Sequence, residues 1–113
     1  MCHPSFIVLT FKEVLIFVLE SQFQSSLIKE LEELYPTSFI FKNETKQGFP
    51  DLTILHPDGW ALLECKRSKD ASHRPNQDWY IEHGKEMQFA SFIYPENKKE
   101  VLDAFQQTLR PGR

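Results

Sequence analysis

The pattern of apolar and polar positions predicts a β-hairpin in the middle of the chain. Residues 52–55 and 60–63 are two short apolar runs of the β type, and the sequence between them, at 56–59, is His-Pro-Asp-Gly. Proline and glycine supply the backbone angles of a tight turn, so two such runs around Pro-Asp-Gly are typical of a hairpin. We therefore expect two neighbouring antiparallel strands here.

The register of this hairpin decides which side chains face each other. A four-residue turn pairs Leu55 with Trp60 and, counting back along both strands, Asp51 with Glu64. A one-residue bulge at Gly59 would slip the pairing by one position. That slip would separate the charged face from the apolar face less cleanly, and we therefore favour the first register.

Alternation of side chains along each strand then sorts the hairpin into two faces. Glu64 and Lys66 share one face, and Asp51 joins them from the neighbouring strand. The opposite face is apolar enough to enter the core and carries Leu52, Ile54, Ala61, Leu63 and Cys65. Two carboxylates repel each other unless something positive lies between them, and their hard oxygen atoms suit Mg²⁺.

The other periodicities predict three helices and two more strands around the hairpin. These elements are a helix at about 12–35, a strand at 37–42, a helix at 75–87, a strand at 89–94 and a helix at 98–109. The order of helix, three strands, helix, strand and helix predicts an α/β domain in which helices flank a mixed sheet.

The first helix carries an acid close to its buried side. Its apolar stripe recurs at helical spacing and consists of Phe23, Leu27, Leu31 and Leu34, and Pro36 ends the helix. Glu20 and Gln24 are one turn apart and point close to this stripe. The alternative is that Glu20 caps the helix or faces solvent at its rim.

Aromatic residues have two open interpretations. Trp60, Trp79 and Tyr80 could stack on unpaired bases. Large aromatic side chains more often pack in cores, and we favour that interpretation, with Trp79 and Tyr80 among the packing residues of the helix at 75–87.

Composition predicts a single globular domain, residues 1–113, with 41% hydrophobic and 26% charged residues. The net charge of −3 has the wrong sign for a protein held to DNA by its overall field. A basic cluster nevertheless follows the hairpin and consists of Lys66, Arg67, Lys69, His73 and Arg74. Local basicity of this kind is enough to place a phosphodiester.

Cysteine, histidine and hydropathy patterns exclude several other classes. Cys2 and Cys65 do not resemble a disulfide framework, which favours reduced thiols and an intracellular protein. The histidines lack zinc-type spacing with cysteines, so we interpret them as surface or loop residues: His3, His56, His73 and His83. No run has membrane-spanning length, and we expect neither a signal peptide nor contact with a membrane.

The sequence Pro50-Asp51 followed by Glu64-Cys65-Lys66 resembles the PD-(D/E)xK nuclease superfamily. A lysine two residues after the second acid can hold a water molecule or neutralise charge that develops on a phosphate. The alternative is an ordinary hairpin with solvated charges on its outer face.

A closer resemblance covers residues 20–109. The matching motifs are Glu20-x-x-x-Gln24, Gln47-Gly48-Phe49-Pro50-Asp51, Glu64-Cys65-Lys66 and Arg74-Pro75-Asn76-Gln77. In this order they are similar to the virus-type replication-repair nuclease (VRR-NUC) domain, above all to its small stand-alone phage members. The resemblance implies a restriction-endonuclease-like core and DNA cleavage that depends on Mg²⁺ or Mn²⁺. It also implies homodimers, branched substrates such as four-way junctions, and the cytoplasm of a bacterial or phage-infected cell.

The resemblance assigns roles to individual residues. Asp51, Glu64 and the backbone carbonyl of Cys65 would bind metal, and Lys66 would be the catalytic lysine. Glu20 would bind or orient metal-bound water. Gln77 would contact Lys66, the attacking water or a phosphate. The Arg74-Pro75-Asn76 sequence departs from the Ser-Pro-Glu that family members often carry.

We therefore expect a metal-dependent endodeoxyribonuclease that acts on DNA, is structure-selective and uses no organic cofactor. The alternatives are a nuclease of restriction or RNA-cleaving type and a catalytically inactive nucleic-acid-binding module on the same fold. Residues 1–19 lie outside the resemblance and are apolar. They would form an extra element packed on the core or against a second subunit, and we expect a homodimer.

Overall fold

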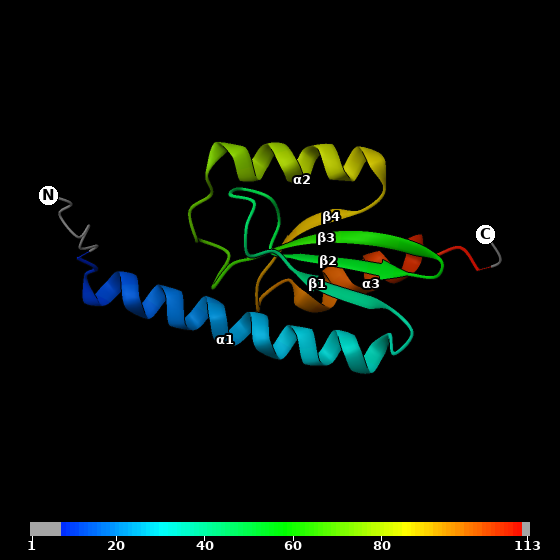
Figure 1. Cartoon of the computed structure of the whole chain (residues 1–113), viewed down its shortest axis with the longest axis horizontal. Helices are drawn as coiled ribbons and strands as arrows, with labels where there is room; N and C mark the ends of the chain where they lie inside the picture. Colours follow the sequence, from blue (N-terminus) through cyan, green and yellow to red (C-terminus); the bar gives the residue numbers. More distant parts are fainter. Residues whose placement is uncertain (1–7, 112–113) are drawn as a thin grey trace, which may run out of the picture.

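The computed structural model describes residues 8–111 as one four-stranded sheet with three helices (Figure 1). In chain order the elements are α1 (Phe11–Leu34), β1 (Phe39–Lys42), β2 (Leu52–His56), β3 (Gly59–Cys65), α2 (Pro75–Met87), β4 (Ala90–Ile93) and α3 (Lys98–Thr108). This is the predicted order, which confirms the mixed α/β class. The predictions for Cys2 and His3 lie outside the described residues.

The hairpin has the predicted register. Leu55 pairs with Trp60, and Leu52 pairs with Leu63, in the antiparallel ladder of β2 and β3. β1 adds to β2 antiparallel, whereas β4 adds to β3 in parallel, so the sheet is mixed and runs in the order β1-β2-β3-β4. The parallel step requires a crossover connection, and α2 provides it.

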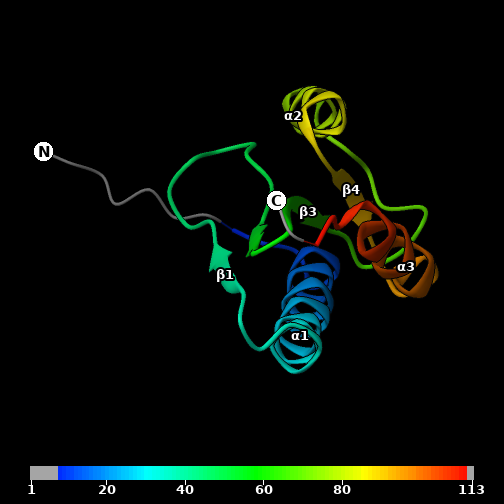
Figure 2. The same cartoon turned by 90° about the vertical axis from the view of Figure 1, so that its right-hand side faces the viewer.

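The sheet is covered by helices on both faces. α2 lies over one face, while α1 and α3 lie over the other (Figures 1 and 2). The five hairpin residues predicted for the core, Leu52, Ile54, Ala61, Leu63 and Cys65, are all buried on the side of α1 and α3. Those two helices contribute Leu27, Leu31, Val101, Leu102 and Phe105 to the same core.

Two predicted packing residues are wrong. Leu34 is 52% exposed, and Tyr35 is buried in its place, with its ring edge-on to that of Phe105 at 5.7 Å. Trp79 is 60% exposed. α2 meets the sheet through Ile81, and a residue two positions earlier lies about 200° away around a helix, on its outer side.

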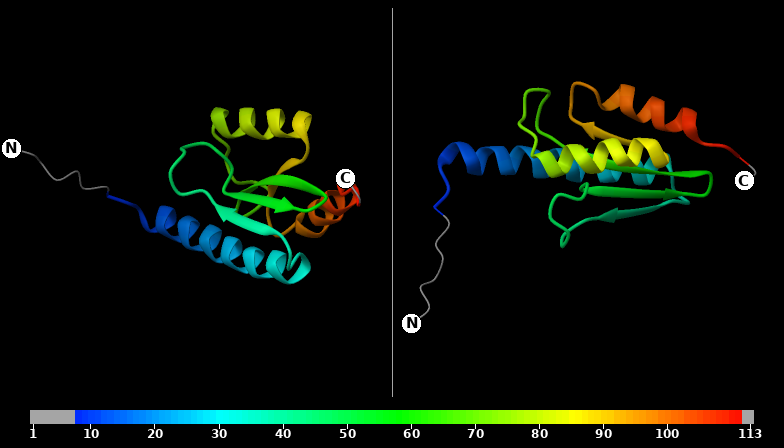
Figure 3. Two further views of the ribbon diagram at one scale, coloured as in Figure 1. Left: turned by 45° about the vertical axis from the view of Figure 1, so that its right-hand side comes forward. Right: turned by 90° about the horizontal axis from the view of Figure 1, so that it is seen from above.

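Residues 11–19 of the apolar N-terminal segment belong to α1 rather than to a separate element. α1 begins after Thr10, whose side-chain oxygen accepts a hydrogen bond from the backbone N–H of Glu13 at 3.1 Å. The prediction that this segment packs on the core is wrong for residues 8–19, because all of them except Ile16 are exposed. The N-terminal half of α1 instead continues past the ends of the strands (Figure 3). None of the helices in the described part of the chain is long and apolar enough to span a bilayer.

Candidate active site

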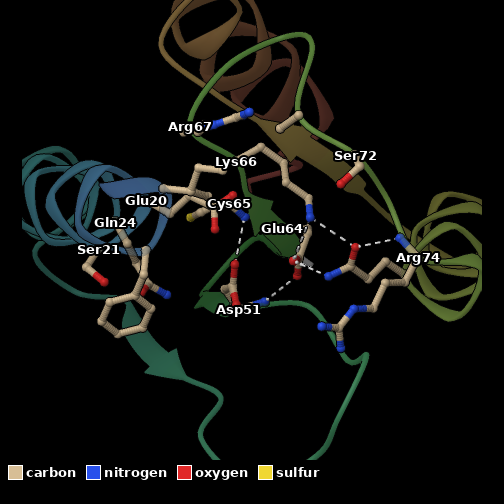
Figure 4. A pocket seen from close by; sticks show the side chains of 14 residues that line it. Glu20, Ser21, Gln24, Asp51, Glu64, Cys65, Lys66, Arg67, Ser72 and Arg74 are labelled. Atoms are coloured by element: carbon tan, nitrogen blue, oxygen red, sulfur yellow. Dashed lines mark hydrogen bonds and ion pairs between the residues drawn. The ribbon is translucent and has the colours of Figure 1, made fainter. Parts of the chain in front are cut away.

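The hairpin register brings two carboxylates together where β2 begins and β3 ends. The backbone N–H of Asp51 donates to Oε1 of Glu64 at 3.2 Å, and the backbone N–H of Cys65 donates to Oδ2 of Asp51 at 2.9 Å (Figure 4). Each carboxylate is thus fixed by the backbone of the neighbouring strand. The predicted pairing of Asp51 with Glu64 follows directly from the turn that sets the register.

Gln77 links the second carboxylate to the lysine. Its side-chain Nε2 donates to Oε2 of Glu64 at 2.9 Å, and its Oε1 accepts from Nζ of Lys66 at 3.0 Å. The Nζ atom of Lys66 lies 3.9 Å from Oε2 of Glu64. Gln77 occupies the first turn of α2, where its Oε1 also accepts from the backbone N–H of Arg74 at 3.0 Å. The helix start and the strand end are therefore locked together.

A cavity of about 440 Å³ opens beside this hydrogen-bonded group. Its walls are formed by α1, the ends of the hairpin strands, the loop after β3 and the start of α2. α1 contributes Glu20, which is half-buried, together with Ser21 and Gln24 (Figure 4). Cys65 also lines the cavity, although its side chain belongs to the core.

Three of the five residues in the predicted basic cluster line the cavity, namely Lys66, Arg67 and Arg74. The other two do not. Lys69 donates its backbone N–H to Oε2 of Glu96 at 3.2 Å, and its side chain is exposed. The ring of His73 stacks on Phe92 with centroids 3.8 Å apart, and its Nδ1 lies 3.1 Å from Oδ1 of Asp78.

Burial raises the free energy of the charged side chains in the site. Glu64 and Lys66 are only 5% and 7% exposed. Burial and then the neighbouring charge of Asp51 raise the pKa of Glu64 to about 8, and Glu20 adds to this effect. Burial also raises the pKa of Asp51, although the hydrogen bond from Cys65 and the charge of Lys66 oppose the rise. A bound cation would therefore stabilise the ionised forms of both carboxylates.

The donor set fits a hard divalent cation. The hydrogen bonds described above engage one oxygen of Asp51 and leave its Oδ1 free of them. Among residues 8–111, no three His, Cys, Asp or Glu side chains gather into a metal-binding group. Mg²⁺ commonly binds through one or two carboxylates and keeps several waters. Asp51 and Glu64, with the cavity beside them, meet that requirement.

The loop between β1 and β2 also borders the carboxylates. No prediction from the sequence placed this loop beside them. A second hollow, of about 290 Å³, is lined by residues 43–49 together with Asp51, Glu64 and Gln77. Asn43 organises this loop, because its Oδ1 accepts from the backbone N–H of Lys46 at 3.1 Å and its Nδ2 donates to the Phe49 carbonyl at 3.1 Å. An asparagine at the start of a polar loop is the sequence signal for such a turn.

Gly48 fits this loop against the first turn of α2. Its φ is +84°, and a Cβ atom at this position would overlap the amide of Asn76, coming within 2.7 Å of its Cγ. We expect Gly48→Ala to lower the free energy of unfolding by about 1 to 3 kcal/mol, through backbone strain and this overlap. Urea denaturation measures the loss.

The double variant Gly48→Ala with Asn76→Ala is the control for the overlap. It should recover part of the loss, because the amide is gone while the strained φ remains. A Gly48→Ala protein as stable as the wild type would contradict this assignment.

Comparison of the chain with protein-family models, with curated proteins and with solved structures found no match. These comparisons therefore assign no function to the site.

Proposed function

We propose that this chain is a metal-dependent endodeoxyribonuclease with a restriction-endonuclease-like core. The observation that carries the proposal is the hydrogen-bonded group of Asp51, Glu64, Gln77 and Lys66 on the wall of a cavity. Paired carboxylates that can hold a divalent cation, with an ammonium group beside them, suit phosphodiester hydrolysis. The resemblance to VRR-NUC domains supports the same reaction.

The residues of the site would have different roles in hydrolysis. Asp51 and Glu64, with the Cys65 carbonyl, would hold Mg²⁺ or Mn²⁺. The bound ion would lower the pKa of water and offset the charge that develops on the phosphate. Lys66, held by Gln77, would stabilise the same charge or orient the nucleophile. Glu20 would orient water from the opposite wall.

The substrate would be DNA, selected by structure. Arg67 and Arg74 line the cavity and can contact phosphates on either side of the cleaved bond. Such contacts carry no sequence information, which suits an enzyme that recognises branched shapes, including four-way junctions, as the resemblance implies. The same resemblance supports a homodimer as the active form.

The test is a cleavage assay on linear, nicked, flapped and four-way-junction DNA side by side, in Mg²⁺, Mn²⁺ or EDTA. We expect cleavage of branched DNA with either metal and none in EDTA. DNA binding without cleavage of any substrate would favour the inactive binding module and overturn the proposal. Cleavage of linear DNA at one sequence, or of RNA alone, would overturn the substrate assignment.

Lys66→Ala tests the role of the ammonium group. We expect cleavage to slow by about 100-fold or more, the range found when a positioned electrostatic or acid–base group is lost. Calorimetry should show that Mg²⁺ still binds, because both carboxylates remain. Lys99→Ala is the matched control, since Lys99 is an exposed lysine on α3. Unchanged cleavage by Lys66→Ala would contradict the role of the lysine.

A further inference from the structure

Trp79 lies on the outer side of α2, and 60% of its surface is exposed. Neighbouring aromatic rings hold its indole in place. The His83 ring stacks on it with centroids 5.0 Å apart and planes 14° from parallel, and the Tyr80 ring lies edge-on to it at 5.1 Å. Because His83 covers one face of the indole, the exposed surface belongs largely to the other face and to the ring edges. An ordered ring with an open face is a surface on which another planar ring can stack.

A row of aromatic contacts connects this indole with the loop beside the carboxylates. Tyr80 contacts Phe49 as well as Trp79, and the rings of Tyr80 and Phe49 are edge-on at 5.3 Å. Phe49 belongs to the loop between β1 and β2, which lies against the start of α2 (Figure 1). This loop lines the hollow of about 290 Å³ that also borders Asp51 and Glu64. The aromatic contacts therefore lead from Trp79 to the candidate active site.

The distance between Trp79 and the carboxylates suits a short stretch of a nucleic-acid strand. Gln77, which binds Glu64, lies on the sheet side of α2, and Trp79 is about 200° farther around the helix. An α-helix with its side chains is about 10 to 12 Å across, so the indole lies about one helix width from the Gln77 amide. Successive bases of a strand are about 3.4 Å apart, so this width corresponds to about three nucleotides.

The charges around Trp79 favour a strand that reaches it from the candidate active site. Arg74 lines the main cavity and Lys46 lines the loop hollow, so both cations lie where the phosphates of such a strand would pass. Beyond Trp79 the outer side of α2 carries Glu82 and Glu86, and both are exposed. These acids would repel a phosphate. The surface therefore suits the base at the end of the path and not a strand that continues along the helix.

The size of the aromatic surface also distinguishes between partners. A protein partner usually covers about 800 Å² of surface. One large aromatic side chain offers only about 150 to 250 Å², and charged residues flank Trp79 on the outer side of α2. The open face of the indole therefore fits a single planar ring better than a protein surface.

We propose that Trp79 stacks an unpaired base of the DNA strand that occupies the candidate active site. The inference rests on the proposed function for the identity of that strand. Bases inside a duplex stack on each other, so only a nucleotide in a single-stranded part, as in a flap or at a branch point, can offer its face to the indole. Every base has a π-face, so this contact reads no sequence. Trp79 would thus favour flapped and branched DNA over fully paired DNA.

Fluorescence anisotropy with labelled DNA tests the stacking site. Flapped DNA and a linear duplex of the same length are compared at low salt in EDTA, so that binding is measured without cleavage. We expect Trp79→Ala to weaken binding of the flapped DNA by about 5- to 150-fold, the effect of losing one stacked base, and to leave binding of the duplex unchanged. Trp79→Phe should recover most of the binding, because it keeps an aromatic face.

The double variant Phe39→Ala with Phe41→Ala is the matched control. These rings are also exposed, but they lie on the edge strand β1, outside the aromatic row, and the variant should bind both DNAs as the wild type does. The stacking site is wrong if the wild type binds neither DNA, if Trp79→Ala binds flapped DNA as tightly as the wild type, or if it loses duplex binding equally. Cleavage in Mg²⁺ is measured separately. A wild type that prefers flapped DNA through Trp79 but cleaves nothing would refute the nuclease and retain the stacking site.

Discussion

We expect Asp51→Asn and Glu64→Gln to lower Mg²⁺-dependent DNA cleavage by on the order of 10³-fold while the protein stays folded. Both substitutions keep the size of the side chain and remove the negative charge that would hold the cation. In Asp51→Asn the new amide oxygen can still accept from the backbone N–H of Cys65, as Oδ2 of the aspartate does now. For Asp51→Asn the loss should therefore come from charge and not from misfolding.

Three measurements separate these effects. Cleavage rates give the loss of activity, calorimetry gives the loss of Mg²⁺ affinity, and thermal unfolding at pH 8 gives the stability. Asp51→Asn removes one of two repelling carboxylates and should leave the metal-free protein as stable as the wild type or slightly more so. Asp70→Asn and Glu33→Gln are matched controls, because both residues are exposed and lie outside the cavity. Near-normal cleavage by either Asp51→Asn or Glu64→Gln would show that this end of the hairpin is not the active site.

The sequence predicted the centre of this site because the relevant information is local. A Pro-Asp-Gly turn fixes the hairpin register, and the register alone brings Asp51 next to Glu64. The position of Gln77 depends on α2 starting at Pro75, and proline in the first turn is itself a local signal. Helix boundaries, the order of the elements along the chain and the five core residues of the hairpin followed from periodicity in the same way.

The features that were missed depend on contacts between distant elements. Trp79 is exposed because α2 turns Ile81 toward the sheet. The adjacent aromatic residues in the sequence do not indicate which side of the helix faces the sheet. His73 belongs to the predicted basic cluster, but its ring stacks on that of Phe92, which lies on β4 and is distant in the sequence. The sequence shows that residues 1–19 are largely apolar, but it does not show that α1 carries residues 11–19 beyond the sheet.

The strongest effect on stability that we expect is a pH dependence caused by Glu64. Its ordinary pKa is 4.5, and burial followed by the charge of Asp51 raises the value in the folded protein to about 8. Between these values the folded state binds a proton that the unfolded state releases. For this group alone, the free energy of unfolding is therefore greatest below pH 4.5. It falls as the pH rises from 4.5 to about 8. Asp51, whose pKa is also raised, acts in the same direction.

We expect the free energy of unfolding in EDTA to fall by about 2 to 4 kcal/mol between pH 5 and pH 8.5, because this range covers most of the gap between the two pKa values of Glu64. Urea denaturation across this range measures it. Glu64→Gln should remove most of the slope, whereas Glu33→Gln should keep it, because Glu33 is exposed on α1. Mg²⁺ should stabilise the wild type more at pH 8.5 than at pH 5.5, since it competes with the proton for the same carboxylates. A slope that Glu64→Gln leaves unchanged would mean that Glu64 is ionised without a cation, and the electrostatic account of the site would be wrong.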